Sequence, residues 1–272
     1  MRLIKVFARV FFVLFFMSYI QVSFAKEVAL TIDDLPFVGS AGKDAAKLRR
    51  ENERFQRILE VLTKYQVPAI GFVVANSIES GQWEWLEKFK AAGNSLGNHS
   101  YSHRSLSRMS TEAYIEDIAK ADEKLAAIMS TPKFFRYPFL SDGSGTTKYS
   151  AVRDYLSAQH YMVAPVTIDS KDFQFNASLL NIPWRSRAAN LDSFKSRYLN
   201  YIWNKTVKAE REAEKKEHRS IKHILLIHMN YLNSYFLENI IQLFQSHGYR
   251  FITLEEAMKD PYYKPYWLSE VK

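Results

Sequence analysis

Short apolar runs alternate with amphipathic segments along most of the chain, and this alternation constrains the fold more than any other feature. The runs are apolar at consecutive positions, which favours strands buried on both faces. We expect strands at 27–32, 69–74, 95–97, 134–139, 161–168, 224–227 and 249–252, and helices at 44–65, 83–92, 110–129, 147–159 and 236–247. Strands separated by helices favour a parallel sheet, and seven or eight such units over this length favour a (β/α) barrel over an open sheet.

The first 25 residues have the pattern of a secretory signal peptide. Three basic residues precede the apolar run Val10–Ile20, and Ser23-Phe24-Ala25 offers small residues for cleavage. We therefore expect residues 1–25 to be a signal peptide cleaved near Ala25, and residues 26–272 to be one exported catalytic domain, periplasmic or extracellular. The apolar run is short for a membrane span, and an uncleaved anchor is the alternative.

Composition narrows the chemistry. The chain of 272 residues has no cysteine, which excludes disulfides and thiolate metal sites, so a metal would need His, Asp or Glu ligands. The net charge of +8 favours contact with an anionic envelope surface, but no nucleic-acid-binding motif accompanies it. Residues 176–219 predict one long helix whose final charged turns, Lys208 to Arg219, form a solvated face; a membrane- or polymer-binding helix is the alternative.

Polar side chains follow the ends of several separate strands. They are Asp33 and Asp34, His99 and His103, Arg136, Asp169 and Asp172, and His228. A parallel barrel would gather such residues at one rim, where barrels carry their chemistry. His99 and His103 could bind one metal ion if the backbone turns helically between them, and otherwise they are surface histidines or histidines satisfied by backbone. Asp33 and Asp34 alone could equally be turn or capping acids.

Five motifs at these strand ends resemble those of the polysaccharide deacetylase (NodB homology) domain, carbohydrate esterase family four. In chain order they are LTIDDLP, GNHSYSH, RYPF, DSKDF and ILLIHM, and together they span roughly residues 28–251. The resemblance implies a distorted (β/α) barrel of about seven units. It also implies a metal-dependent hydrolase that removes acetyl groups, most simply N-acetyl groups, from an envelope or extracellular glycan.

The resemblance also implies roles for individual residues. Asp34, His99 and His103 resemble the metal ligands, and two nitrogens with one carboxylate suit zinc. Asp33 resembles the general base that accepts a proton from metal-bound water, and His228 resembles the general acid that protonates the leaving amine.

Further residues resemble the supporting groups of the family's site. Arg136 matches the arginine that keeps the base ionised, and the backbone N–H of Phe139 matches the oxyanion donor. Asp172 matches the acid that keeps the catalytic histidine protonated, with Asp169 as the fallback.

Four residues depart from the family's usual pattern. Met229 stands where Asp is usual, Phe173 for a Trp that lines the groove, Leu140 for Gly, and Ile32 for Phe. We expect Phe173 and Leu140 to narrow the substrate groove and Met229 to make the surroundings of His228 less polar. Two other functions stay open for this reason: a non-catalytic glycan-binding protein on the same scaffold, and a metal hydrolase acting on a non-glycan amide.

Overall fold

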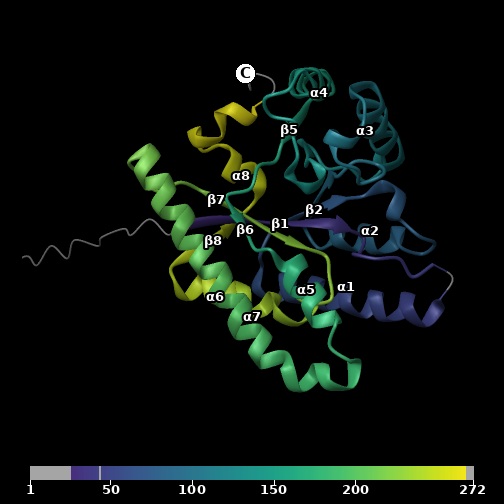
Figure 1. Cartoon of the computed structure of the whole chain (residues 1–272), viewed down its shortest axis with the longest axis vertical. Coiled ribbons are helices and arrows are strands. Elements are labelled where there is room, and N and C mark those ends of the chain that lie inside the picture. The colour runs from purple at the N-terminus through teal and green to yellow at the C-terminus, as the bar shows by residue number, and fades with distance from the viewer. Residues whose placement is uncertain (1–25, 43, 268–272) are drawn as a thin grey trace, which may run out of the picture.

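A computed structural model describes residues 26–42 and 44–267, and its centre is a curled sheet of eight parallel strands (Figure 1). The order is β5-β4-β3-β2-β1-β7-β6, with β8 paired to β1. The strands are β1 (Lys26–Leu35), β2 (Ala69–Val73), β3 (Ser95–Asn98), β4 (Lys133–Phe135), β5 (Tyr161–Val163), β6 (Ile168–Asp169), β7 (His223–His228) and β8 (Tyr249–Ile252). Because β5 and β6 form opposite edges of the sheet, the barrel stays open between them. The expected distorted (β/α) barrel is confirmed.

Helices surround the sheet. They are α1 (Ala45–Tyr65), α2 (Trp83–Ala91), α3 (Thr111–Leu125), α4 (Thr147–Ala158), α5 (Asp172–Leu180), α6 (Trp184–Glu217), α7 (Asn233–Ser246) and α8 (Leu254–Met258), with short 3-10 turns η1 (Ala75–Ser77), η2 (Leu106–Arg108), η3 (Pro138–Leu140) and η4 (Pro261–Tyr266). Figure 1 shows α6 as a long rod beside the sheet, near α7. Most of the longer helices bury an apolar stripe, as α1 does with Phe55, Ile58, Leu59 and Leu62.

Strand β1 organises the sheet. It is buried from Val28 to Asp33, as its continuous apolar sequence requires. Val28 and Ala29 pair with both β7 and β8, so these two strands lie on opposite sides of β1, and β2 takes the place of β8 further along. The register with β7 aligns Asp33 with His228, residues 195 positions apart in the sequence. Parallel pairing therefore places the first and last predicted catalytic residues side by side.

Three predicted elements were wrong in their boundaries. The expected strand at 134–139 ends as β4 at Phe135, and Pro138, which lacks an amide hydrogen, begins the turn η3. The expected strand at 161–168 is interrupted: β5 ends at Val163, and β6 begins at Ile168 on the other edge of the sheet. The expected single helix over 176–219 is two helices, α5 and α6, which separate before Trp184. Pro183 precedes α6, and a proline disfavours helical geometry in the residue before it and lacks an amide hydrogen.

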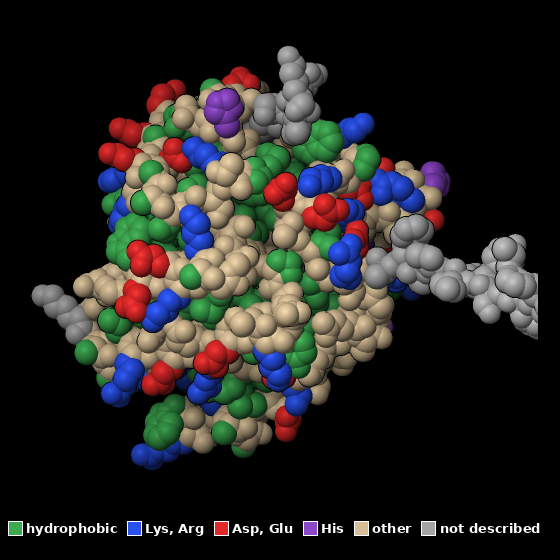
Figure 2. Space-filling model, turned by 180° about the vertical axis from the view of Figure 1, so that it is seen from behind, with side chains coloured by type: hydrophobic (Ala, Val, Ile, Leu, Met, Phe, Trp, Pro, Cys, Tyr) green, Lys and Arg blue, Asp and Glu red, His purple; other side chains and the backbone are tan. Residues whose placement is uncertain are grey.

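The charged end of α6 behaves as a solvated helix face, as expected. Its buried side is the stripe Phe194, Tyr198, Ile202, Thr206, Ala209 and Ala213, and the remaining positions are mostly charged or polar. Figure 2 shows basic and acidic side chains interspersed with apolar ones on the face opposite to that of Figure 1. No helix within 26–42 or 44–267 is long and apolar enough to span a bilayer, and the predicted signal peptide lies outside these residues.

Candidate active site and metal centre

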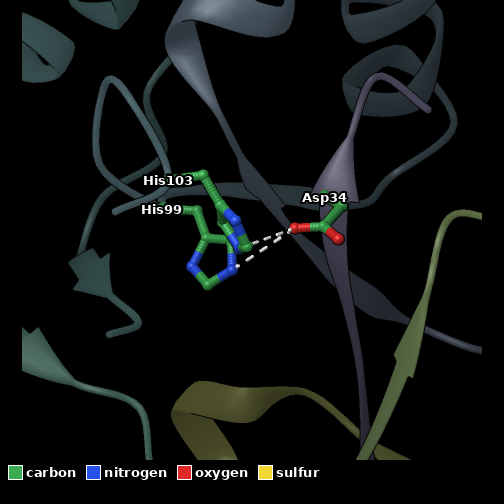
Figure 3. Close-up of side chains that lie close together, drawn as sticks. All are labelled: Asp34, His99 and His103. Atoms are coloured by element: carbon green, nitrogen blue, oxygen red, sulfur yellow. Dashed lines mark ion pairs between the residues drawn. The ribbon is translucent and has the colours of Figure 1, made fainter. Parts of the chain in front are cut away.

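Asp34, His99 and His103 meet at the carboxyl end of the sheet (Figure 3). Both imidazole rings turn toward the Asp34 carboxylate, which lies at the end of β1. His103 Nε2 lies 3.2 Å from Asp34 Oδ1, and His99 Nε2 lies 3.6 Å from the same oxygen. One potential ligand atom from each residue lies within 4.8 Å of the other two.

This arrangement fits a divalent ion. Nitrogen and oxygen ligands at about 2.0–2.1 Å from a tetrahedral ion stand roughly 3.3 Å apart, close to the observed separations. Asp34 Oδ1 is buried without a hydrogen-bond partner, which is expected of an oxygen that binds a metal ion. His99 Nδ1 lies 2.8 Å from the carbonyl oxygen of Arg136 and donates to it, which leaves Nε2 with a lone pair for the ion. Burial also lowers the pKa of His99, against the attraction of Asp33 and Asp34, so the ring is kept neutral.

The loop that carries the histidines is not helical. His99 directly follows β3, and both Ser100 and His103 have positive φ, 65° and 55°. Ser100 Oγ accepts from the backbone N–H of His103, while Asp117 accepts from the N–H groups of Tyr101 and Ser102. The predicted helical stacking of the two histidines was therefore wrong, although the rings do converge.

Asp33 lies beside this centre in a buried ion pair. Arg136 is fully buried, and its Nη1 lies 3.2 Å from Asp33 Oδ1. The same guanidinium donates to Thr31 Oγ1 and to the carbonyl oxygens of Ala164 and Pro165. All of these bonds fix the guanidinium, so Asp33 is held with its second oxygen 3.7 Å from His99 Nε2.

His228 lies at the end of β7, lines the same cavity as the candidate metal ligands, and is hydrogen-bonded to Asp172. Its Nδ1 donates to Asp172 Oδ1 at 2.6 Å, and its backbone N–H donates to Asp172 Oδ2. Burial opposes protonation of the ring, but the Asp172 carboxylate outweighs it and raises the pKa of His228 to about 10. Burial likewise opposes ionisation of Asp172, yet the contacts with His228 hold its pKa below the usual range. At neutral pH the pair is imidazolium and carboxylate.

Sequence reasoning missed the two asparagines that complete this pair. Asn230 and Asn233 each donate a side-chain amide hydrogen to Asp172 Oδ2, at 2.8 and 2.6 Å. Their spacing of three residues immediately after His228 could have indicated a polar support. They also correct the expectation for Met229, which is fully buried in the core, while the amides and Asp172 make the setting of His228 polar.

The fallback choice of Asp169 was wrong. Asp169 accepts a hydrogen bond from the backbone N–H of Lys171 and forms an ion pair with the side chain of that lysine, whereas Asp172 contacts His228 directly. The difference arises because Asp169 ends β6, while Asp172 begins α5 and turns back beneath the imidazole.

A cavity of about 540 Å³ lies over these residues. Its lining brings together Asp33, Asp34, His99, His103 and His228, with Phe139, Leu140, Phe173, Val38 and Leu180 among the apolar residues. The Phe139 ring packs against His103 in a tilted arrangement, with 4.7 Å between centroids and 54° between planes, and the centroid of the Phe173 ring lies 5.9 Å from that of His228. Phe173 and Leu140 thus line the cavity, the volume of which is that of an ordinary ligand site, and the expected narrowing of the groove stays a prediction.

The match to known sequences decides the family. The profile described as polysaccharide deacetylase matches residues 23–157, which contain the first three motifs. The chain belongs to the polysaccharide deacetylase family. The residues of the fourth and fifth motifs, including Asp172 and His228, lie beyond that match, and their expected roles rest on the resemblance of those motifs to the family.

Curated relatives in the family are distant. The peptidoglycan-N-acetylglucosamine deacetylase of Bacillus cereus is 26% identical over 149 residues, 54% of this chain and 46% of the relative. The chitin deacetylase of Colletotrichum lindemuthianum is 27% identical over 154 residues, 55% of this chain and 54% of the relative. The chain thus spans about half the length of these relatives.

Solved structures share the fold over most of the chain. BA3943, described as a CE4 family pseudoenzyme from Bacillus anthracis, has a TM-score of 0.61 at 19% identity, over 86% of this chain and 66% of that one. The peptidoglycan deacetylase PdaC of Bacillus subtilis has a TM-score of 0.57 at 22% identity, over 86% and 92%. At this identity the likeness concerns the fold alone.

Proposed function

We propose that this polysaccharide deacetylase is a metal-dependent hydrolase that removes N-acetyl groups from an envelope or extracellular glycan. The main support is that two paired groups line the same cavity as the His99, His103 and Asp34 cluster. One is Asp33, which is paired with Arg136, and the other is protonated His228, which is paired with Asp172. Family relatives named for peptidoglycan and chitin support an acetylated glycan as the substrate. The ligand set supports zinc as the ion.

The residues divide the reaction between two sides of the cavity. An ion held by Asp34, His99 and His103 would polarise the acetyl carbonyl and make water more acidic. Asp33, fixed by Arg136, accepts the proton of the attacking water. His228, protonated at neutral pH, donates a proton to the leaving nitrogen, without which an amide would not expel its amine. The Phe139 N–H stabilises the developing oxyanion.

A non-catalytic glycan-binding protein is the second candidate. A structural neighbour is described as a pseudoenzyme of this fold. This chain departs from the usual family motifs at Leu140 and Phe173, which line the cavity, and at Met229, which follows the candidate general acid His228. A glycan-binding protein does not need both a general base and a general acid. The presence of Asp33 and His228, each held by its own partner, therefore favours the enzyme.

Acetate release tests the choice. Purified protein with Zn²⁺ is incubated with N-acetylglucosamine oligomers, and wild type should release acetate, whereas Asp33→Asn and His228→Ala should each lose about 10²–10⁴ fold. Asp154→Asn and His160→Ala are matched controls, because both residues are exposed and neither lines the cavity. Release that is absent from every acetylated glycan, or unchanged in Asp33→Asn, would overturn the enzymatic proposal.

We further infer that the protein is exported and that residues 26–272 form one catalytic domain. The basic start, apolar run and small residues before Lys26 support export. N-terminal sequencing of protein from the natural host should find Lys26 first, and an intact Met1 would contradict cleavage.

A further inference from the structure

A second cavity adjoins the catalytic one. It has a volume of about 490 Å³, and its lining is His103, Arg104, Ser105, Ser107, Arg108, Phe139 and Ser141. His103 and Phe139 line both cavities, so the two spaces share a wall that includes a candidate metal ligand. The second cavity therefore lies directly beside the candidate metal ligands.

The charge of this cavity is positive and unbalanced. Arg104 and Arg108 are exposed, and within the described part of the chain neither guanidinium group makes an ion pair or a hydrogen bond. The lining contains no carboxylate. The acid next to it in sequence, Asp142, accepts hydrogen bonds from the backbone and hydroxyl of Ser144. Other arginines of the chain do pair with carboxylates, as Arg219 does with Asp260.

The segment that carries the arginines is anchored. Leu106 lies between them in the sequence and is fully buried in a cluster with Tyr114, Ile118 and Phe135. Ser105 caps the 3-10 turn η2 by accepting from the N–H of Ser107. Because the buried leucine fixes the turn, both arginines start from a defined backbone beside the cavity.

We propose that Arg104 and Arg108 form a subsite for an anionic substituent, a carboxylate or a phosphate, on the acetylated glycan. This inference rests on the proposed function and names the substrate class of the same site. Guanidinium forks match both anions in geometry, and the three serines of the lining can add neutral hydrogen bonds. The site is local, because elsewhere, as on the face in Figure 2, charges of both signs are interspersed.

Equilibrium binding tests the subsite independently of turnover. The Asp33→Asn protein, loaded with Zn²⁺, is titrated calorimetrically with three N-acetylglucosamine tetramers: neutral, carrying an ether-linked lactate, and carrying a phosphate monoester. We expect one or both anionic tetramers to bind about tenfold or more tightly than the neutral one, with the preference weakening as salt rises. His228→Gln is run in parallel in case Asp33→Asn folds poorly.

The preference should depend on the two arginines. Adding Arg104→Gln and Arg108→Gln should bring the anionic-to-neutral affinity ratio close to one, whereas Arg197→Gln with Arg211→Gln, the same charge change on α6, should leave the ratio intact. Metal content is measured for each variant, since Arg104 adjoins His103. Equal affinities for all three tetramers, or a ratio unmoved by the Arg104/Arg108 changes, would overturn the subsite. Anion-selective binding by a wild type that releases no acetate would overturn the proposed function alone.

Discussion

Replacing Asp172 with Asn should abolish the high basicity of His228. The four donors on Asp172 decide the outcome: the Nδ1–H and backbone N–H of His228, and the amides of Asn230 and Asn233. Three of them point at Oδ2, so the single carbonyl oxygen of an asparagine would stay with those three. Its amide group would then face His228 Nδ1, which must become an acceptor, and the ring is left neutral with its hydrogen on Nε2.

The size of the effect follows from the pKa. A value raised from 6.5 to about 10 corresponds to about 5 kcal/mol of preference for the protonated ring in the folded state. Because the folded pKa lies above the unfolded one, this stabilisation is complete below pH 6.5 and is lost as pH rises toward 10. The difference in unfolding free energy between wild type and Asp172→Asn should therefore shrink by several kcal/mol, at most about 5, between pH 6.5 and 10.

Two measurements on metal-free protein check this prediction. Urea unfolding at several pH values gives the free-energy difference, and NMR of the His228 ring gives its titration directly, with Asp154→Asn as the control. A wild-type His228 that titrates near 6.5, or a free-energy difference that is constant over this pH range, would refute the assignment of Asp172 as the partner that keeps the acid protonated.

Three further predictions concern stability. Arg136→Met should lower the unfolding free energy in urea by about 3–5 kcal/mol, because buried Asp33 loses its partner, while Arg49→Met at an exposed position should cost less than about 1; equal losses would contradict this. Leu140 has a positive φ of 54°, so Leu140→Gly should leave stability unchanged or raise it by up to about 1 kcal/mol, and a clear loss in thermal unfolding would speak against backbone strain there. Burial lowers the pKa of His223 to about 4, so its contribution is present above pH 6.5 and falls as pH drops toward 4. His223→Gln should remove up to about 3 kcal/mol of that acid-induced loss, and an identical pH dependence in the variant would contradict it.

The convergence of the site was predictable because it depends on topology more than on local conformation. Strands apolar at every position must be buried on both faces, parallel strands share one carboxyl edge, and the polar residues stood at that edge. Asp33 and His228 illustrate this, since their register neighbours follow from parallel pairing of two apolar strands. The fold and the convergence of these residues were accessible in this way, whereas Asn230 and Asn233, which donate to Asp172, were not.

Local geometry was less accessible. The left-handed backbone at His103 depends on a hydrogen bond to Ser100 and on Asp117 from another element, which no spacing rule reports. The choice between Asp169 and Asp172 depended on where β6 ends and where α5 begins. The two acids are only three positions apart in the sequence, but only Asp172 is placed to contact His228. The cavity at Arg104 and Arg108 depended on the burial of Leu106 between them.

The metal content of the purified protein tests the centre of this account most directly. After incubation with excess Zn²⁺ and desalting, wild type should retain about one ion per chain by elemental analysis, as a site with two imidazoles and one carboxylate should. A His99→Ala, His103→Ala double variant, and separately Asp34→Asn, should retain almost none, while a His160→Ala, His247→Ala control should match wild type, with folding of each verified by circular dichroism. Wild type that retains no ion, or folded ligand variants that retain as much as wild type, would contradict the assignment of Asp34, His99 and His103 as the metal centre.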